Sequence, residues 1–241
     1  MRLGILAAGI TPDELLSEFG AFSDMFIQLF NGTGCLFEYE VFDVRDGSFP
    51  DTVEQCDGWI ITGSKCGVNQ NLLWMRKLKQ LVLDVFAAKI PMVGICFGHQ
   101  IIADAFGGKV DKYKGGWGIG LHSYRFTGEH EFFIDTPAGF TINAMHQDQV
   151  ITKPSNAQLF ATSDFCKYAG LIYDNRIITF QAHPEFSVAF EEALIELRKG
   201  DVIPSEAADK GLETLRQKDV AIEALRIAQM IVSFITNRIA R

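Results

Sequence analysis

The sequence lacks any long apolar segment. No stretch approaches the roughly 20 apolar residues that a membrane-spanning helix needs. The apolar run at residues 3–8 is too short for the core of a signal peptide and is typical of a first buried strand. We therefore expect a cytoplasmic protein with no membrane segment.

Positive charge is also scarce. Lys and Arg number 22 against 30 Asp and Glu, which gives a net charge of −8, and the charges are scattered along the chain. Nucleic acids and acidic membranes are bound by clustered Lys and Arg. We therefore expect neither as a partner.

The cysteines offer no pairing pattern. There are five, an odd number, with no C-x-x-C spacing, at positions 35, 56, 66, 96 and 166. A disulfide framework, a structural zinc site or any other metal site is therefore not expected. Most of these cysteines, including Cys66, should be small buried residues. Cys96 differs because of its neighbours.

No linker rich in proline, glycine or serine divides the 241 residues, and 48% of them are apolar, enough for a full core. Apolar runs predict buried strands at residues 3–8, 35–44, 59–62, 90–95 and 177–181. Apolar residues at helical spacing predict helices from residue 12 onward, at 72–88 and at 97–106. This alternation predicts an α/β fold: a three-layer, open, mostly parallel sheet with helices on both faces.

The middle and the end of the chain have a different character. Residues 110–180 contain strand-like sequence broken by turns, which predicts a small antiparallel portion. The chain after residue 190 is helical, with a break around residues 200–204. A last amphipathic helix should bury one face, formed by Leu225, Ala228, Val232 and Ile235.

The segment around Cys96 is the most informative. An apolar strand runs into Gly94-Ile95-Cys96-Phe97-Gly98 and continues as a helix, the thiol counterpart of the Gly-x-Ser-x-Gly nucleophile elbow. Its turn is so tight that the residues two before and two after the nucleophile must be small. The helix N-terminus favours a thiolate, and the Phe97 N–H can help to hold an oxyanion. A buried structural cysteine between two packing glycines is the alternative.

A thiolate nucleophile needs an imidazole partner, and His183 fits best. It follows an apolar strand, and Glu185 lies two residues later across Pro184, where it can accept a hydrogen bond from the ring. His99 should point away from the elbow opening, and His122 and His130 lie in turn-rich sequence. By itself, His-Pro-Glu is more typical of a surface turn; together with the elbow it predicts a triad.

These segments resemble the class I, triad-type glutamine amidotransferases. The stretch from Gly94 to Gln100 resembles their G-x-C-x-G-x-Q motif, and the stretch from Gln181 to Glu185 resembles Q-x-H-P-E. Residues 60–64 are similar to their glycine loop, and residues 145–150 to the S-H-x-D-x-V segment of the GMP synthase amidotransferase domain. The resemblance implies a flavodoxin-like fold, a catalytic domain at residues 1–190, and a helical extension at 191–241 packed on the same domain.

The resemblance also implies roles. Cys96 would form a γ-glutamyl thioester, His183 would relay protons, and Glu185 would orient His183. The backbone N–H groups of Gly63 and Phe97 would form the oxyanion hole. The residues implied to contact the substrate are Gln100, Gly116, Trp117, His146 and Asp148. The glycine loop departs from the family pattern, because it continues as Ser64-Lys65-Cys66-Gly67.

Three functions remain open at this point. The first is hydrolysis of the glutamine side-chain amide, with ammonia released or passed to a separate synthase subunit. The second is hydrolysis of other γ-glutamyl amides or peptides by the same triad. The third is a non-catalytic binding protein, against which the complete triad argues. No nucleotide-binding loop is visible, because the Gly107-Gly108-Lys109 segment lacks the other P-loop residues, and no cofactor is expected.

Overall fold

Strands and helices alternate along the first half of the chain. The computed structural model describes residues 1–128, 138–217 and 220–239. The strands are β1 Arg2–Ala7, β2 Glu38–Asp43, β3 Gly58–Ile61, β4 Met92–Ile95, β5 Lys109–Lys112, β6 Gly118–Phe126, β7 Gly139–His146, β8 Asp148–Thr152, β9 Ala157–Thr162, β10 Gly170–Tyr173 and β11 Ile177–Phe180. The α-helices are α1 Asp13–Phe19, α2 Phe22–Asn31, α3 Leu73–Ala87, α4 Phe97–Ala105, α5 Val188–Arg198, α6 Ser205–Leu215 and α7 Ala224–Ile239.

The large sheet has two halves. Its strand order is β2-β1-β3-β4-β11-β10-β9-β6-β7. The pairs from β2 to β11 are parallel, and the pairs from β11 to β7 are antiparallel. A separate antiparallel pair joins β5 and β8. The predicted α/β fold class is confirmed, and antiparallel strands also extend the large sheet itself.

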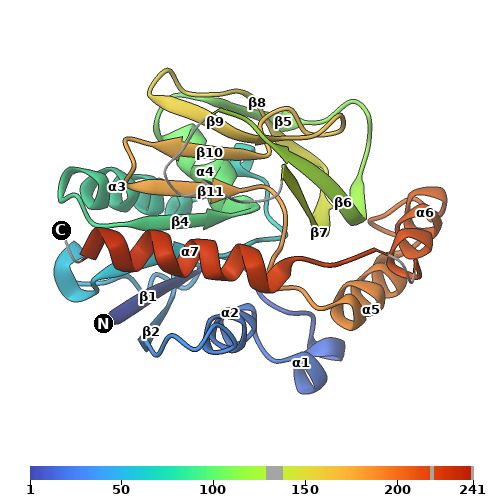
Figure 1. Ribbon diagram of the computed structural model, residues 1–241, viewed down its shortest axis with the longest axis horizontal. Coiled ribbons are helices and arrows are strands. Elements are labelled where there is room, and N and C mark those ends of the chain that lie inside the picture. The colour runs from blue at the N-terminus through green and yellow to red at the C-terminus, as the bar shows by residue number, and fades with distance from the viewer. Residues whose placement is uncertain (129–137, 218–219, 240–241) are drawn as a thin grey trace.

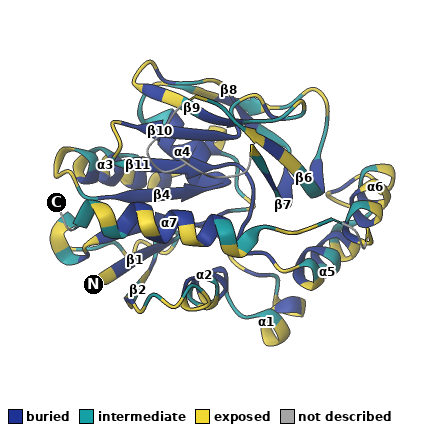
Figure 2. Cartoon of the chain, viewed as in Figure 1, coloured by how far each residue is buried: buried dark blue, intermediate teal, exposed yellow. Residues whose placement is uncertain are grey.

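Helices cover both faces of the parallel half, so the molecule has three layers (Figure 1). On one face, residues of α2 and α7 pack in one core cluster with side chains of β1, β3, β4 and β11. On the other face, α3 and α4 pack on alternate side chains of the same strands. The central strands are therefore buried throughout, as their dark colour in Figure 2 shows.

Some local predictions need correction. The second strand begins at Glu38, and Leu36 before it is 84% exposed. The first helical segment divides in two at Gly20, whose φ of +75° ends α1. Leu225 is 49% exposed, although Ala228, Val232 and Ile235 are buried as predicted. Leu225 lies in the first turn of α7, at one end of the predicted stripe.

The C-terminal helices lie against two different parts of the sheet. Helix α7 crosses the parallel half (Figure 1), while α5 and α6 lie beside β6. The predicted break is present, because α5 ends at Arg198 and α6 begins at Ser205. The boundary between a catalytic domain and an extension at residue 190 stays a prediction.

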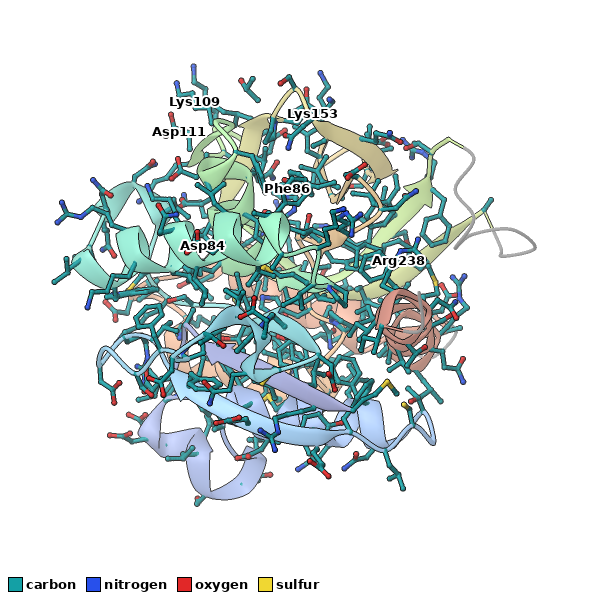
Figure 3. All side chains as sticks on the ribbon, turned by 90° about the vertical axis from the view of Figure 1, so that its left-hand side faces the viewer. Asp84, Phe86, Lys109, Asp111, Lys153 and Arg238 are labelled. Atoms are coloured by element: carbon teal, nitrogen blue, oxygen red, sulfur yellow. The ribbon has the colours of Figure 1, made fainter. Side chains whose placement is uncertain are left out.

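Charged side chains cover the periphery. In Figure 3, Lys109 and Asp111 project from the edge formed by β5, and their charged groups lie 3.8 Å apart. Among the residues that the structure describes, no helix is both long and apolar enough to cross a bilayer.

Candidate active site

Three neighbouring parallel strands deliver the predicted catalytic residues to one edge of the sheet. Strand β4 pairs with β3 on one side and with β11 on the other. Gly63 follows β3, Cys96 follows β4, and His183 follows β11. Because the carboxyl ends of parallel strands meet at the same edge, residues 120 positions apart in sequence lie together there.

The backbone at Cys96 has the strained turn of a nucleophile elbow. Cys96 has φ 51° and ψ −99°, which residues with a side chain rarely adopt. A Cβ on Gly94 would lie 2.7 Å from the Gly98 backbone, and one on Gly98 would lie 2.4 Å from the Ile61 oxygen. Larger residues would therefore force the strand and the helix apart, as the sequence argument requires.

His183 and Glu185 form a buried, directly bonded pair. The His183 Nδ1 lies 2.7 Å from the Glu185 Oε1, and both residues are almost wholly buried. The ring of His183 stacks on that of Phe186, with centroids 4.0 Å apart and planes within 7°. The imidazole is thus held on one edge by a carboxylate and on one face by an aromatic ring.

The charges around His183 favour its protonated form. Burial by itself would lower the pKa of His183, but the charges of Glu185 and Cys96 raise it well above the usual value. The hydrogen bonds that the ring donates to these two partners act in the same direction. The arrangement therefore suits an imidazolium between the Cys96 sulfur and the Glu185 carboxylate.

Gly63 closes the site above Cys96 and His183. A Cβ on Gly63 would lie 2.8 Å from the His183 Cε1 and 3.8 Å from the Cys96 Cβ. Only glycine therefore leaves room for the His183 ring in its present place. Phe97 is the first residue of α4, so its N–H has no partner within the helix and lies beside the sulfur-bearing residue.

Two further groups approach the sulfur of Cys96. The Gln181 Nε2 lies 3.6 Å from the Cys96 Sγ, and the backbone oxygen of Met145 lies 3.9 Å from it. Met145 belongs to β7, so the antiparallel half of the sheet also reaches the Cys96 sulfur.

Known proteins resemble this chain in sequence and in fold. The profile of the family "Glutamine amidotransferase class-I" matches residues 17–196. Gamma-glutamyl peptidase 5 of Arabidopsis thaliana is 30% identical over 229 residues, which span 90% of this chain and 89% of the relative. The chain belongs to the class-I glutamine amidotransferase family.

Other known proteins match a shorter part of the chain or share a lower sequence identity with it. A glutamine-hydrolyzing GMP synthase subunit of Methanococcus aeolicus is 36% identical over 102 residues, 42% of this chain and 53% of the relative. The crystal structure of a glutamine amidotransferase from Thermotoga maritima superposes with a TM-score of 0.76 at 19% identity, covering 100% of this chain and 98% of the other. That structural likeness shows the shared fold.

The residues predicted to contact substrate lie in different settings of this amidotransferase fold. Gln100 is buried, and its Nε2 donates to the Asp148 backbone oxygen at 2.8 Å and to the Gln181 Oε1 at 3.2 Å. The Asp148 carboxylate lies beside the glycine loop, since a Cβ on Gly67 would lie 2.7 Å from its Oδ2. Burial raises the pKa of Asp148. Gln100 and Asp148 therefore belong to one connected wall.

The other predicted contact residues lie at the end of β7 and in the turn before β6. His146 is buried, and burial together with its neighbour His122 lowers its pKa to about 3, so its ring is neutral. Trp117 is half-buried against an apolar cluster, and Gly116 turns the chain with φ +90°. Within the described part of the chain, no hydrogen bond joins Gly116 or Trp117 to the triad.

Three further histidines and Cys66 are the other candidates that the sequence offers. The His99 Nδ1 lies 2.8 Å from the Thr179 hydroxyl, and burial lowers the His99 pKa to about 3. His122 lies within strand β6 rather than in a turn, and His130 lies outside the described residues. Cys66 is half-buried, more open than predicted. None of these three described residues bonds to the triad.

Sequence reasoning missed two buried residues next to the triad. The Asn143 backbone oxygen accepts from the His183 N–H at 2.8 Å, and its side-chain Nδ2 donates to the Phe186 oxygen at 2.7 Å. Glu191 of α5 is fully buried, and burial raises its pKa to about 8. Asn143 has no local signal. For Glu191 the available hint was an acid one turn into the helix that follows His-Pro-Glu.

Proposed function

We propose that this amidotransferase hydrolyses γ-glutamyl amide bonds, with Cys96 as nucleophile, His183 as proton carrier and Glu185 as the residue that orients His183. One observation carries the proposal: a Cβ placed on Gly63 would lie within 3.8 Å of both Cys96 and His183, so the three residues border one point, and His183 is bonded to Glu185 at 2.7 Å. A thiol, an imidazole and a carboxylate in this order are what acyl transfer through a cysteine requires.

The reaction proceeds in two stages. The Cys96 thiolate attacks the side-chain carbonyl carbon, and the N–H groups of Gly63 and Phe97 stabilise the negative oxygen. His183 gives its proton to the leaving nitrogen, the C–N bond breaks, and a γ-glutamyl thioester remains on Cys96. His183 then takes a proton from water, the resulting hydroxide attacks the thioester, and the C–S bond breaks to release the free acid.

The wall of the site would hold the amino-acid end of the substrate. We assign this contact to Asp148, His146 and the turn at Gly116-Trp117. The Gln100 Nε2 is not assigned to the substrate, because it already donates to the Asp148 backbone oxygen and to Gln181. This group instead stabilises the wall.

Glutamine is the first candidate substrate, with ammonia released or passed to a separate synthase. The similarity to the GMP synthase subunit of Methanococcus aeolicus supports it, although that match spans only 42% of this chain. Such a synthase would be a separate protein partner. The free state of all five cysteines fits a cytoplasmic location.

γ-Glutamyl peptides or amines are the second candidate, favoured by a specific observation. Two relatives named gamma-glutamyl peptidase align over 89% and 90% of this chain, far more than the GMP synthase subunit does. The acyl half of the reaction is unchanged, and only the leaving amine differs.

A panel assay tests the function. Glutamine and γ-glutamyl peptides and amines are offered to the full chain, and release of ammonia or amine is measured. Cys96→Ala and His183→Ala should each lower turnover by about 1,000-fold or more, since each removes a reacting group. A glutamine-like diazo ketone should label Cys96 irreversibly.

Cys56→Ala is the matched control, because Cys56 is also buried but lies away from the triad. It should keep wild-type turnover. Retention of activity in Cys96→Ala, or no turnover on the whole panel by the folded protein, would refute the proposal and favour a binding role.

A further inference from the structure

Gln181 connects the nucleophile to the wall of the site. It is fully buried and lies two residues before His183. Its Nε2 lies 3.6 Å from the Cys96 Sγ, and its Oε1 accepts from the Gln100 Nε2 at 3.2 Å. The same Gln100 nitrogen donates to the Asp148 backbone oxygen at 2.8 Å. A continuous chain of hydrogen bonds thus runs from β8 to the sulfur.

The orientation of both amides follows from the end of this chain. A backbone oxygen can only accept, so the Gln100 group that faces Asp148 must be its NH₂. That NH₂ also faces Gln181, which must therefore present its oxygen. The NH₂ of Gln181 is then the group left to face Cys96. Rotating either amide would place two acceptors or two donors against each other inside the protein.

The strand register brings the two side chains together. Phe180 pairs with Ile95 across β11 and β4, and the Cys96 N–H donates to the Phe180 oxygen at 2.8 Å. Gln181 follows directly and is fixed by its own N–H, which donates to the Ala169 oxygen at 2.8 Å. A buried N–H donor beside sulfur stabilises the negative form more than the neutral form, because a hydrogen bond to a charged acceptor is the stronger one.

We propose that Gln181 is a positioning residue for Cys96, which aims the sulfur and favours its thiolate by donating a hydrogen bond whose direction is fixed by Gln100 and the Asp148 backbone. This rests on the proposed function of Cys96. Gln181 and His183 then supply donors to one sulfur, the first uncharged and fixed, the second able to transfer its proton.

The test compares Gln181→Met with the wild type. Methionine has a similar volume but no N–H donor. The rate of Cys96 alkylation by iodoacetamide is followed against pH, with the Cys96 peptide quantified by mass spectrometry because Cys35 and Cys66 are also partly accessible. The midpoint of alkylation should move to higher pH by about one unit. On the best substrate of the panel, kcat should fall about tenfold, with KM changing less than about twofold.

Gln149→Met is the matched control, because Gln149 is a buried glutamine that donates to the Phe165 oxygen and not to sulfur. Its alkylation midpoint should equal that of the wild type. A loss of packing alone would affect both variants, whereas a loss of the donor to sulfur affects only Gln181→Met.

Two results separate this proposal from the proposed function. If Cys96→Ala is inactive but folded Gln181→Met keeps the wild-type alkylation midpoint, the role of Gln181 is wrong and the triad stands. If Gln181→Met does not fold, Gln181→Asn decides, since its shorter amide cannot reach the sulfur. A higher midpoint in Gln181→Asn supports the proposal, and an unchanged one overturns it.

Discussion

At the scale of single residues, the backbone of Cys96 is strained, as the tight turn predicted from the sequence motif implies. Its φ of 51° with ψ −99° is unfavourable for any residue that carries a Cβ, by about 1–3 kcal/mol. Glycine tolerates this region, although glycine also loses more conformational freedom on folding, by about 0.5–1 kcal/mol relative to alanine. At this position, the strain that a glycine would relieve is therefore larger than the additional entropy that glycine loses on folding.

We accordingly expect Cys96→Gly to be more stable than Cys96→Ala by about 1 kcal/mol in the free energy of unfolding. Cys56 supplies the opposite case, because it is buried with an ordinary extended backbone, φ −126° and ψ 151°. There the glycine variant should be the less stable of the pair. Urea unfolding of the four variants measures both differences. The same order at both positions would contradict strain at the elbow.

At the scale of elements, side chains of α5 and α6 bond to a stretch of β6 that, among the described residues, pairs only with β7. Strand β6 pairs with β9 only at Arg125 and Phe126. Nearer its start, the Gly120 N–H donates to the Glu191 Oε1 at 3.1 Å, and the Leu121 N–H donates to the Thr214 Oγ1 at 2.8 Å. The helices thus complete the hydrogen bonding of the strand that precedes the site wall.

Glu191 should make stability depend on pH. Burial raises its pKa from 4.5 to about 8, so in the folded protein the carboxyl stays neutral over a range in which it is ionised in the unfolded chain. The stability that the neutral carboxyl of Glu191 contributes to the folded protein is therefore fully present below about pH 4.5 and is lost as the pH rises through about 8. Glu191→Gln cannot ionise and should escape this loss.

The measurement is urea unfolding at pH 5, 7 and 9. Between pH 5 and pH 9, the free energy of unfolding of the wild type should fall by about 4 kcal/mol more than that of Glu191→Gln. This follows from about 1.4 kcal/mol per pKa unit. Glu196→Gln, an exposed acid on the same helix, serves as control and should follow the wild type. Parallel curves for all three proteins would show that Glu191 is ionised in the folded state.

At the scale of the whole molecule, the C-terminal helix is part of the central core. The family profile ends at residue 196, yet Ile227, Ile231, Phe234 and Ile235 of α7 are fully buried in one cluster with Leu3 and Ile5 of β1. The first strand and the last helix therefore bury each other, and α7 packs on the parallel half of the sheet.

Ile231→Ala should lower the free energy of unfolding by about 2–4 kcal/mol, because it leaves a cavity in this cluster. Leu225→Ala removes a side chain that is 49% exposed on the same helix and should cost less than about 0.5 kcal/mol. Thermal and urea unfolding of the two variants measures the difference. Equal losses would mean that α7 does not pack through its Ile231 face.

Much of the fold and the centre of the site could be predicted from local patterns. Apolar runs and helical spacing gave the strands and helices of the parallel half within a few residues, since a buried parallel strand has no polar face to obscure it. The elbow at Cys96 was predictable because its glycines are required by a backbone turn within five residues. The His183–Glu185 bond was predictable because residues two apart in an extended segment share a side.

The sequence by itself determined which chemistry the chain carries: a cysteine at a tight strand-to-helix turn, and an imidazole with its carboxylate at the end of another strand. Only the tertiary structure decided which groups surround that chemistry, because strand order and pairing register are not written in any local pattern. The placement of β11 beside β4 brings Gln181 to the sulfur, the end of β7 brings Asn143 to His183, and the packing of α5 on β6 buries Glu191. Each is a contact across at least 40 residues of chain, formed through space by the burial of a common core.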